Sequence, residues 1–320
     1  MTYIAGIDGG GTKTTAVITT ADGKFAAKAS AGPVNPNVVK QDELYETFSG
    51  LMHDLSQQDR MAFNQLTSLF AGISGAGNNK AVQMLTGLLK ELIPEKTRVR
   101  VEPDTVNALY SGTLGEPGIV QIAGTGSITF GINAEGRRDR TGGWGYLFGD
   151  EGSGYDIGKA GITAALKAFD GRGRDTVLFD MVCSHFQIAD PYNLIQYIYS
   201  LPSPKSAISP VAKLVFEAYK QQDTVAAKIM RDAATEVMTS IQTLKAKLYQ
   251  PDEKVNAVLC GGIFEDKDVL LKLLKKEFQS DQTLTLITPD MTPVGGSIIG
   301  ACLMENNSPD ETIVQNLSRM

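Results

Sequence analysis

The chain has 320 residues, enough for two domains that each bury their own core. Its composition, 42% hydrophobic and 21% charged, is ordinary for a globular protein, and its net charge of −6 without a basic run argues against a nucleic-acid partner. Cys183, Cys260 and Cys302 are far apart and only two histidines are present, so neither a disulfide framework nor a zinc site is expected. The N-terminus lacks a signal-peptide pattern and no apolar run reaches the ~20 residues of a membrane span, which predicts a cytoplasmic location and no membrane partner.

The chain opens with a glycine-rich turn, GIDGGGTKT at residues 6–14, between two short apolar segments. This pattern is typical of a β-hairpin. Three glycines without Cβ atoms allow left-handed φ angles and let backbone N–H groups approach an anion, while Asp8 offers a carboxylate for Mg²⁺. The turn therefore predicts a site for a metal-bound polyphosphate, with a plain glycine-rich hairpin as the alternative. It is neither a Walker A motif nor a Rossmann fingerprint.

Strand and helix patterns then follow in turn. We expect a third strand at 25–29, a helix at 41–58, a strand at 66–73, a helix at 80–92 and a strand at 98–101. The loop at 31–37 contains two prolines and two asparagines. Asn35 or Asn37 could offer an amide to a polar ligand such as a sugar hydroxyl, or serve only the loop.

Asp104 stands at the end of the strand at 98–101 and before a predicted helix. Asp is a favourable helix N-cap, which is one reading of this position. The other is a functional acid, since Asp104 would face the same crevice as Asp8 if the two strands are neighbours.

The N-terminal layout then repeats about 115 residues later in the chain. Strands are expected at 119–123, 128–132 and 137–140, with a glycine–threonine turn at 124–127. Two related turns from two related domains could hold a triphosphate from opposite sides.

The most unusual stretch is GGWGYLFGDEGSG at residues 142–154. Trp144, the only tryptophan, could stack on a sugar ring or anchor the loop. Asp150 could bond sugar hydroxyls or cap a helix that begins near Ser153.

The remaining chain reads as helical up to residue 250, and then as alternating strands and helices. Gly261 and Gly262 follow a buried strand, where they could form a tight turn or let a flat ring approach the backbone. The expected helices lie at 155–169, 177–186, 191–200, 207–221, 224–249, 269–278 and 298–304, and the strands at 255–260 and 284–287.

Together these motifs resemble the BadF/BadG-type ATPase group of the actin-like superfamily, and within it the N-acetylglucosamine and glucosamine kinases. The motifs that carry the resemblance are GIDGGGTKT, Pro103-Asp104, GTGS at 124–127, GGWG at 142–145, GDEGS at 149–153 and LCGG at 259–262. They occur in the expected order over nearly the whole chain.

The resemblance implies an α/β fold of two ribonuclease-H-like domains, each with a five-stranded mixed sheet, and a ligand cleft between them. The first domain would span residues 1–115, completed by the C-terminal helix at about 296–320. The second would span 116–295 with a helical insertion.

The resemblance also implies an ATP- and Mg²⁺-dependent kinase acting on the 6-hydroxyl of an amino sugar, with Asp104 as general base and Asp8 holding Mg²⁺. A homodimer is a possible state, since members of the family are often dimers. The implied nucleotide contacts are Gly10, Gly11, Thr12, Lys13, Gly124, Thr125, Gly126, Gly261 and Gly262. The implied sugar contacts are Asn35, Ser127, Gly143, Trp144, Gly145 and Asp150.

One position departs from the family pattern. Ile128 stands where vertebrate N-acetylglucosamine kinases have an asparagine that contacts the sugar, and isoleucine cannot form that hydrogen bond. N-acetylglucosamine, glucosamine and N-acetylmuramate therefore all remain open, as does the choice between Asn35 and Asn37. The alternative functions are an activator ATPase of a radical dehydratase or reductase and a sugar-sensing regulator on the same fold.

Overall fold

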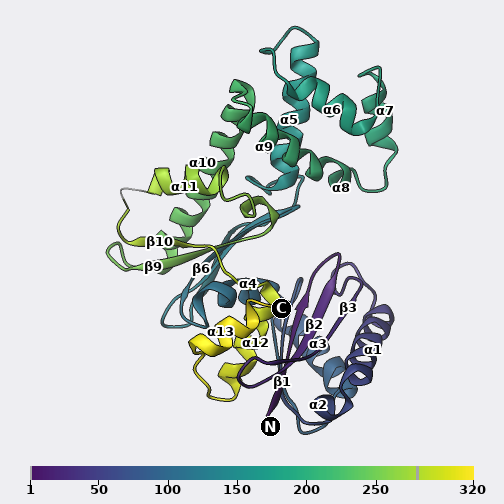
Figure 1. Cartoon of the computed structure of the whole chain (residues 1–320), viewed down its shortest axis with the longest axis vertical. Coiled ribbons are helices and arrows are strands. Elements are labelled where there is room, and N and C mark those ends of the chain that lie inside the picture. Colours follow the sequence, from purple (N-terminus) through teal and green to yellow (C-terminus); the bar gives the residue numbers. More distant parts are fainter. Residues whose placement is uncertain (1, 279–280) are drawn as a thin grey trace. The chain divides into compact units, whose positions relative to one another are not determined.

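We describe the protein from a computed structural model that covers residues 2–278 and 281–320. The chain divides into two compact units (Figure 1). Unit 1 comprises Met1–Glu116 and Pro289–Met320, and unit 2 comprises Pro117–Thr288. Each unit is built on one five-stranded sheet.

The sheet of unit 1 has the strand order β3-β2-β1-β4-β5. The first three strands form the antiparallel meander that the sequence predicts, and β1, β4 and β5 run parallel. The strands are β1 (Tyr3–Gly9), β2 (Thr14–Thr20), β3 (Phe25–Ala31), β4 (Leu66–Ile73) and β5 (Arg98–Glu102).

Helices cover both faces of this sheet. Because side chains alternate along a strand, Ala5 and Ile7 of β1 pack into the core under α1 and α3, while Gly6 faces α12. Asp8 lies two positions after Gly6 and therefore on the same face of β1, where Asn107 of α4 bonds its carboxylate. The helices of unit 1 are α1 (Gln41–Gln58), α2 (Arg60–Asn64), α3 (Asn79–Leu92), α4 (Asp104–Thr113), α12 (Pro293–Met304) and α13 (Glu311–Leu317).

The sheet of unit 2 has the order β10-β9-β6-β7-β8, which is the same topology when read from its other edge. An antiparallel meander again leads the unit and two parallel strands complete it, as the sequence repeat predicts. The strands are β6 (Gly118–Ala123), β7 (Ser127–Ile132), β8 (Arg138–Gly142), β9 (Val255–Cys260) and β10 (Leu284–Ile287).

Most of the remaining chain of unit 2 is helical (Figure 1). The single helix expected at 207–221 is wrong, because the chain passes through a 3-10 turn, η1, centred on Pro210, which has no N–H to donate. The elements are α5 (Gly154–Phe169), α6 (Leu178–Phe186), α7 (Asn193–Ser200), α8 (Pro204–Ile208), η1 (Ser209–Val211), α9 (Ala212–Lys220), α10 (Thr224–Leu248), η2 (Gly262–Phe264) and α11 (Leu270–Glu277).

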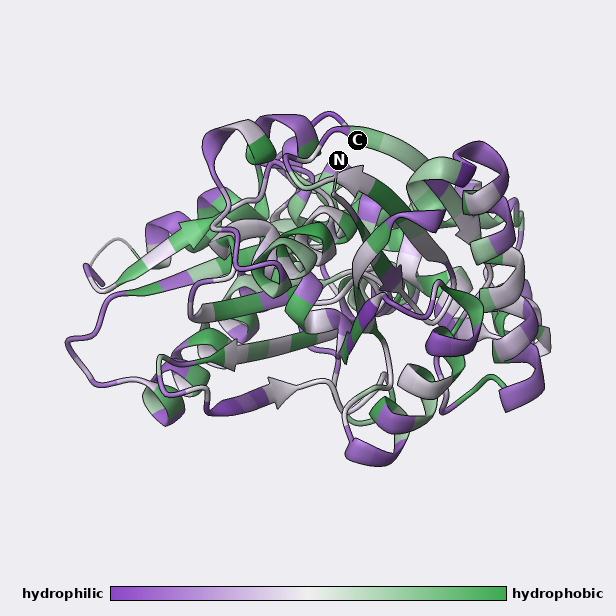
Figure 2. Ribbon diagram, turned by 90° about the horizontal axis from the view of Figure 1, so that it is seen from below, coloured by the Kyte–Doolittle hydropathy of each residue, from purple (hydrophilic) through white to green (hydrophobic). Residues whose placement is uncertain are grey.

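Each unit encloses its own hydrophobic core, and Figure 2 shows green hydrophobic segments along the strands and purple residues on loops and outer helices. Cys260 and Cys302 are buried, in different units. Over the described ranges, no helix is both long enough and apolar enough to cross a bilayer.

Candidate active site

The glycine-rich turn joins β1 to β2 and leaves Gly11, Thr12 and Lys13 exposed. Its backbone closes through a hydrogen bond from the Gly10 N–H to the Lys13 carbonyl (2.9 Å). The left-handed φ angles that glycine allows are not used here, because Gly9, Gly10 and Gly11 all lie outside the left-handed region. Glycine is needed for space at Gly9, where a Cβ would lie 2.6 Å from the Val34 side chain, whereas Gly11 faces open space.

Asp8 is held at the end of β1 by Asn107 of α4. The amide nitrogen of Asn107 donates to Asp8 Oδ1 and to the Ile7 carbonyl, both at 3.0 Å, and lies 3.3 Å from the Gly72 carbonyl. Three acceptors around one amide nitrogen fix its orientation. Within the described ranges, Asp8 Oδ2 has no hydrogen-bond partner. Burial raises the pKa of Asp8, and the hydrogen bond from Asn107 partly offsets this.

Asp104 is the first residue of α4 and lies beside Asp8. The N-cap position belongs to Pro103, and the nearby Thr105 N–H and Ser74 hydroxyl lower the pKa of Asp104 in part. Burial, followed by the charge of Asp8, raises the pKa of Asp104 to about 6. Two neighbouring carboxylates with different partners are a common arrangement for acid–base chemistry.

Asn35 lies beside the same group. Its amide nitrogen is 3.4 Å from Ser74 Oγ, its oxygen accepts the Asn37 N–H at 2.9 Å, and Gly75 leaves room for both asparagine side chains. Asn35 is half-buried and Asn37 is exposed. The end of the unit 1 sheet thus brings together two acids, two amides and a hydroxyl.

Sequence reasoning missed Ser74 and Asn107 as site residues. A signal for Asn107 was present, since it follows Asp104 by three positions and therefore lies on the same face of the helix. Ser74 stands in the small-residue loop after β4, where ligands often bind in α/β sheets.

In unit 2 the turn at 124–127 joins β6 to β7. It is closed by a hydrogen bond from the Gly124 N–H to the Gly126 carbonyl (2.9 Å), and Thr125 is exposed. The Ser127 hydroxyl accepts from Gln121 Nε2 at 2.9 Å, and Gln121 itself is 1% exposed. Gln121 is therefore a buried support for Ser127 that sequence reasoning did not identify.

The loop after β8 needs its glycines for backbone conformation, since Gly143 and Gly145 have φ values of 68° and 82°. Trp144 is 67% exposed, so it does not anchor the loop in a core. One face of its ring carries the guanidinium of Arg140, 4.7 Å from the ring centroid. The same guanidinium donates to the Gly143 carbonyl at 2.9 Å.

Asp150 is 4% exposed and adopts φ = 63°, which is unusual for a residue with a side chain. Its carboxylate accepts the Ser127 N–H (3.1 Å) and the Lys205 ammonium (2.8 Å). The expected alternative, that Asp150 caps α5, is wrong because Ser153 is the cap. Lys205 lies 55 positions further along the chain, and no sequence signal pointed to it.

A cavity of about 620 Å³ opens beside the turn at 124–127 in unit 2. Gly261 has φ = 104° and passes so close to the Ala123 carbonyl that no side chain fits, while Gly262 faces the open cavity. The volume is in the range of small-molecule sites. Its lining comprises Gly124, Thr125, Gly154, Ser209, Pro210, Ala212, Lys213, Phe216, Glu217, Lys220, Gly262, Ile263, Glu265 and Asp266.

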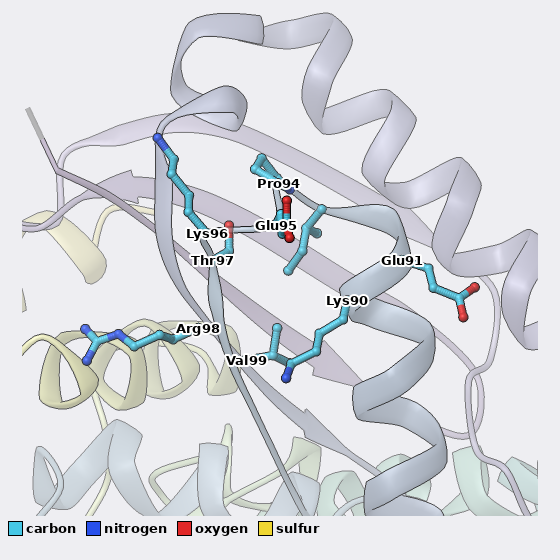
Figure 3. A pocket seen from close by; sticks show the side chains of 9 residues that line it. Lys90, Glu91, Pro94, Glu95, Lys96, Thr97, Arg98 and Val99 are labelled. Atoms are coloured by element: carbon cyan, nitrogen blue, oxygen red, sulfur yellow. The ribbon is translucent and has the colours of Figure 1, made fainter.

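A second hollow, of about 740 Å³, lies in unit 1 between the end of α3 and β5 (Figure 3). It is lined by residues 90, 91 and 93–99, and neither Asp8 nor Asp104 is among them. Arg98 at its rim is already paired with Glu305 at 2.8 Å. The candidate catalytic and binding side chains lie at the ends of the two sheets and not in this hollow.

In residues 2–278 and 281–320, no three or more His, Cys, Asp or Glu side chains gather as a metal-binding group. A cation bound mainly through phosphate oxygens needs fewer protein ligands, and the open oxygen of Asp8 suits such a cation.

The chain matches the BadF/BadG/BcrA/BcrD ATPase family over residues 5–304. It is 33% identical to an N-acetylmuramic acid/N-acetylglucosamine kinase of Clostridium acetobutylicum over 276 residues, which are 86% of this chain and 90% of the relative. It is 32% identical to an N-acetyl-D-glucosamine kinase of Dictyostelium discoideum over 287 residues, with the same coverage of both chains.

Among solved structures, one assigned as an N-acetylglucosamine kinase from Chromobacterium violaceum superposes with a TM-score of 0.73 at 24% identity. The superposition covers 93% of this chain and 98% of that one, and at this identity it establishes the fold alone. The predicted fold class, two five-stranded mixed sheets of the actin-like type, is confirmed. The resemblance drawn from the motifs is confirmed as well: the chain belongs to the BadF/BadG/BcrA/BcrD ATPase family.

Proposed function

We propose that the protein is an ATP-dependent kinase that phosphorylates the 6-hydroxyl of an amino sugar. The enzyme class is supported by two relatives named as amino-sugar kinases, each covering 86% of the chain. The observation that carries the chemistry is the pair of acids at the end of the unit 1 sheet, where Asp104 has a pKa of about 6 beside Asp8.

Asp104 is the proposed general base. With a pKa of about 6 it is ionised at neutral pH yet basic enough to take a proton as the new bond forms. The Thr105 N–H and the Ser74 hydroxyl lie near its carboxylate and favour the ionised form. In the reaction the sugar oxygen attacks the γ-phosphorus, its proton passes to Asp104, and the bond to the β–γ bridging oxygen breaks to release ADP.

Asp8 is the proposed ligand of Mg²⁺, directly or through water. Its Oδ1 is held by Asn107 and its Oδ2 is open, which fits a cation that keeps waters and phosphate oxygens as its other ligands. The ion would neutralise charge on the phosphates.

For ATP, we assign the adenosine to the unit 2 cavity and the phosphates to the two glycine–threonine turns. Gly262 lines this cavity and carries no side chain, so a flat ring could approach its backbone, and Gly261 packs directly behind it against the Ala123 carbonyl. The proposed phosphate contacts are Gly10, Gly11, Thr12, Lys13, Gly124, Thr125 and Gly126.

For the acceptor, Asn35 is favoured over Asn37 because it lies against Ser74, which itself contacts Asp104. On unit 2 the proposed contacts are Ser127, Asp150, Trp144 and the backbone of Gly143 and Gly145. The division into an N-terminal and a C-terminal ATPase domain, a cleft between them, a cytoplasmic location and a homodimer stay predictions.

A coupled assay of ADP release tests the proposed function directly. We expect turnover with ATP and Mg²⁺ to be stimulated by at least one sugar among glucosamine, N-acetylglucosamine, N-acetylmuramate and N-acetylmannosamine, with glucose as the control that lacks nitrogen. Equal background ADP release with every sugar would refute the kinase proposal.

Asn107→Ala is expected to raise the Mg²⁺ concentration for half-maximal activity by about 10–100-fold, because Asp8 loses the group that orients it. It also leaves the carbonyls of Ile7 and Gly72 without this donor, which should cost about 1–3 kcal/mol of stability. Mn²⁺ binding in the presence of ADP, measured by electron paramagnetic resonance, separates the two effects.

The matched control is Asn316→Ala in the same unit, which removes a comparable amide bond, to the Asp22 carbonyl (2.9 Å), away from the acids. An unchanged Mg²⁺ requirement in Asn107→Ala would show that Asn107 does not position Asp8.

A further inference from the structure

The ion pair between Lys205 and Asp150 joins two distant parts of unit 2. Lys205 lies on α8 in the helical segment, and Asp150 lies in the loop before α5. The ammonium nitrogen is 2.8 Å from Oδ2, and the side chains are 25% and 5% exposed. The pair is therefore largely removed from water.

The pair lies directly against the turn at 124–127. A Cβ added to Gly126 would lie 2.9 and 3.1 Å from the two carboxylate oxygens of Asp150 and 3.1 Å from the Lys205 nitrogen. The Lys205 ammonium nitrogen also lies 5.6 Å from the centroid of the Tyr146 ring. Only a glycine in the turn lets this pair come so close.

The carboxylate of Asp150 is fixed but not saturated. One oxygen accepts the Ser127 N–H and the other accepts Lys205. An ionised carboxylate offers about four lone-pair sites, so two remain. The neighbouring Ser127 hydroxyl is itself oriented by Gln121.

Stability alone gives a weak reason for such a pair, since burying two charges costs about as much as their attraction returns. Capping of α5 does not explain the pair either, because Ser153 is the N-cap of that helix. A carboxylate whose orientation is fixed and whose remaining lone pairs are unused suits recognition of hydroxyl groups.

We propose that Lys205 is a positioning residue for the acceptor sugar: it fixes the carboxylate of Asp150 beside Ser127 so that its remaining lone pairs bind sugar hydroxyls. This inference rests on the proposed function, because it needs a sugar at the turn of unit 2. It assigns a role in acceptor recognition to the helical segment that carries α8.

Lys205→Met keeps an unbranched side chain, one atom shorter, and removes its charge. We expect the KM for the sugar to rise by about 10–100-fold, as for the loss of a charged hydrogen-bonding partner, while the KM for ATP stays within about twofold. Lys205→Arg should lie closer to the wild type, because it keeps the positive charge. The matched control is Lys228→Met, which removes an exposed lysine paired with Asp232 in the same unit.

Lys205→Met leaves Asp150 buried without its cation and could prevent folding. The double variant Asp150→Asn/Lys205→Met removes both charges and is expected to fold, with the same rise in sugar KM as Asp150→Asn alone, because Lys205 acts through Asp150. Additive effects of the two substitutions on sugar KM would overturn the inference.

Failure of this inference can be told apart from failure of the proposed function. If the wild type shows sugar-stimulated turnover and folded Lys205→Met has an unchanged sugar KM, the inference about Lys205 is wrong and the kinase proposal stands. If the wild type turns over no sugar and calorimetry detects no sugar binding, both fail. A changed ATP KM with an unchanged sugar KM would place Lys205 on the nucleotide side and also overturn the inference.

Discussion

Asp104→Asn is expected to lower kcat by a factor of about 10²–10⁴, the usual contribution of a general base. The KM for ATP should change little, because the amide keeps the shape of the carboxyl group and is assigned no nucleotide contact. The measurement is ADP release with a saturating sugar. Full activity in this variant would exclude Asp104 as the base and leave the kinase proposal intact.

The pH dependence of the wild type follows from the same residue. Because burial and the charge of Asp8 raise the pKa of Asp104 to about 6, kcat/KM for the sugar should fall as the pH drops below about 6 and reach a plateau above it. The base is protonated, and so inactive, at the acid end.

The free energy of unfolding should fall as the pH rises, whereas kcat/KM should rise. The folded pKa of Asp104, about 6, lies above the ordinary value of 3.8 for an aspartate, so the folded state holds its proton more tightly and loses stability as the pH rises from about 4 to 6. Asn cannot ionise, so Asp104→Asn should be more stable than the wild type at pH 8, by up to about 3 kcal/mol, and show little difference near pH 4. Thermal unfolding at both pH values tests this; a less stable variant at pH 8 would contradict it.

Gly296→Ala is expected to destabilise unit 1 by about 3 kcal/mol or more. Gly296 lies where α12 crosses α4, and a Cβ there would overlap the Asn107 carbonyl oxygen and lie 2.7 Å from the Ser111 nitrogen. Both are backbone atoms, so the two helices would have to separate. Because α4 also carries Asp104 and Asn107, the folded fraction of the variant should be less active as well. Chemical denaturation and the kinase assay measure the two effects.

Gly87→Ala is the matched control, since it makes the same substitution in the exposed middle of α3. No atom lies within 4 Å of a Cβ at this position. Alanine is a better helix former than glycine, so this variant should be more stable by about 0.5–1 kcal/mol and fully active. Equal destabilisation by both substitutions would show that close contact at Gly296 is not the cause.

Local pattern was enough to predict most of the secondary structure. The helix expected at 41–58 and the strands at 66–73 and 284–287 have the predicted bounds, because hydrophobic period and flanking turn residues act over a few neighbours. The short helix α2 was missed, since five residues carry too little periodicity to register. The repeat of strand and glycine turn predicted two related sheets, and both are present.

The candidate site likewise contains residues that local sequence could predict and residues that only the packing brings together. Asp8, Asp104 and the glycine-rich turns could be proposed from sequence, because an acid or a glycine cluster at a strand end is a local feature. That Asn107 orients Asp8, that Gln121 supports Ser127 and that Lys205 pairs with Asp150 depend on which elements pack together. Lys205 and Asp150 are 55 positions apart in the sequence. Only the packing of α8 near the turn at 124–127 brings their charged groups within contact distance.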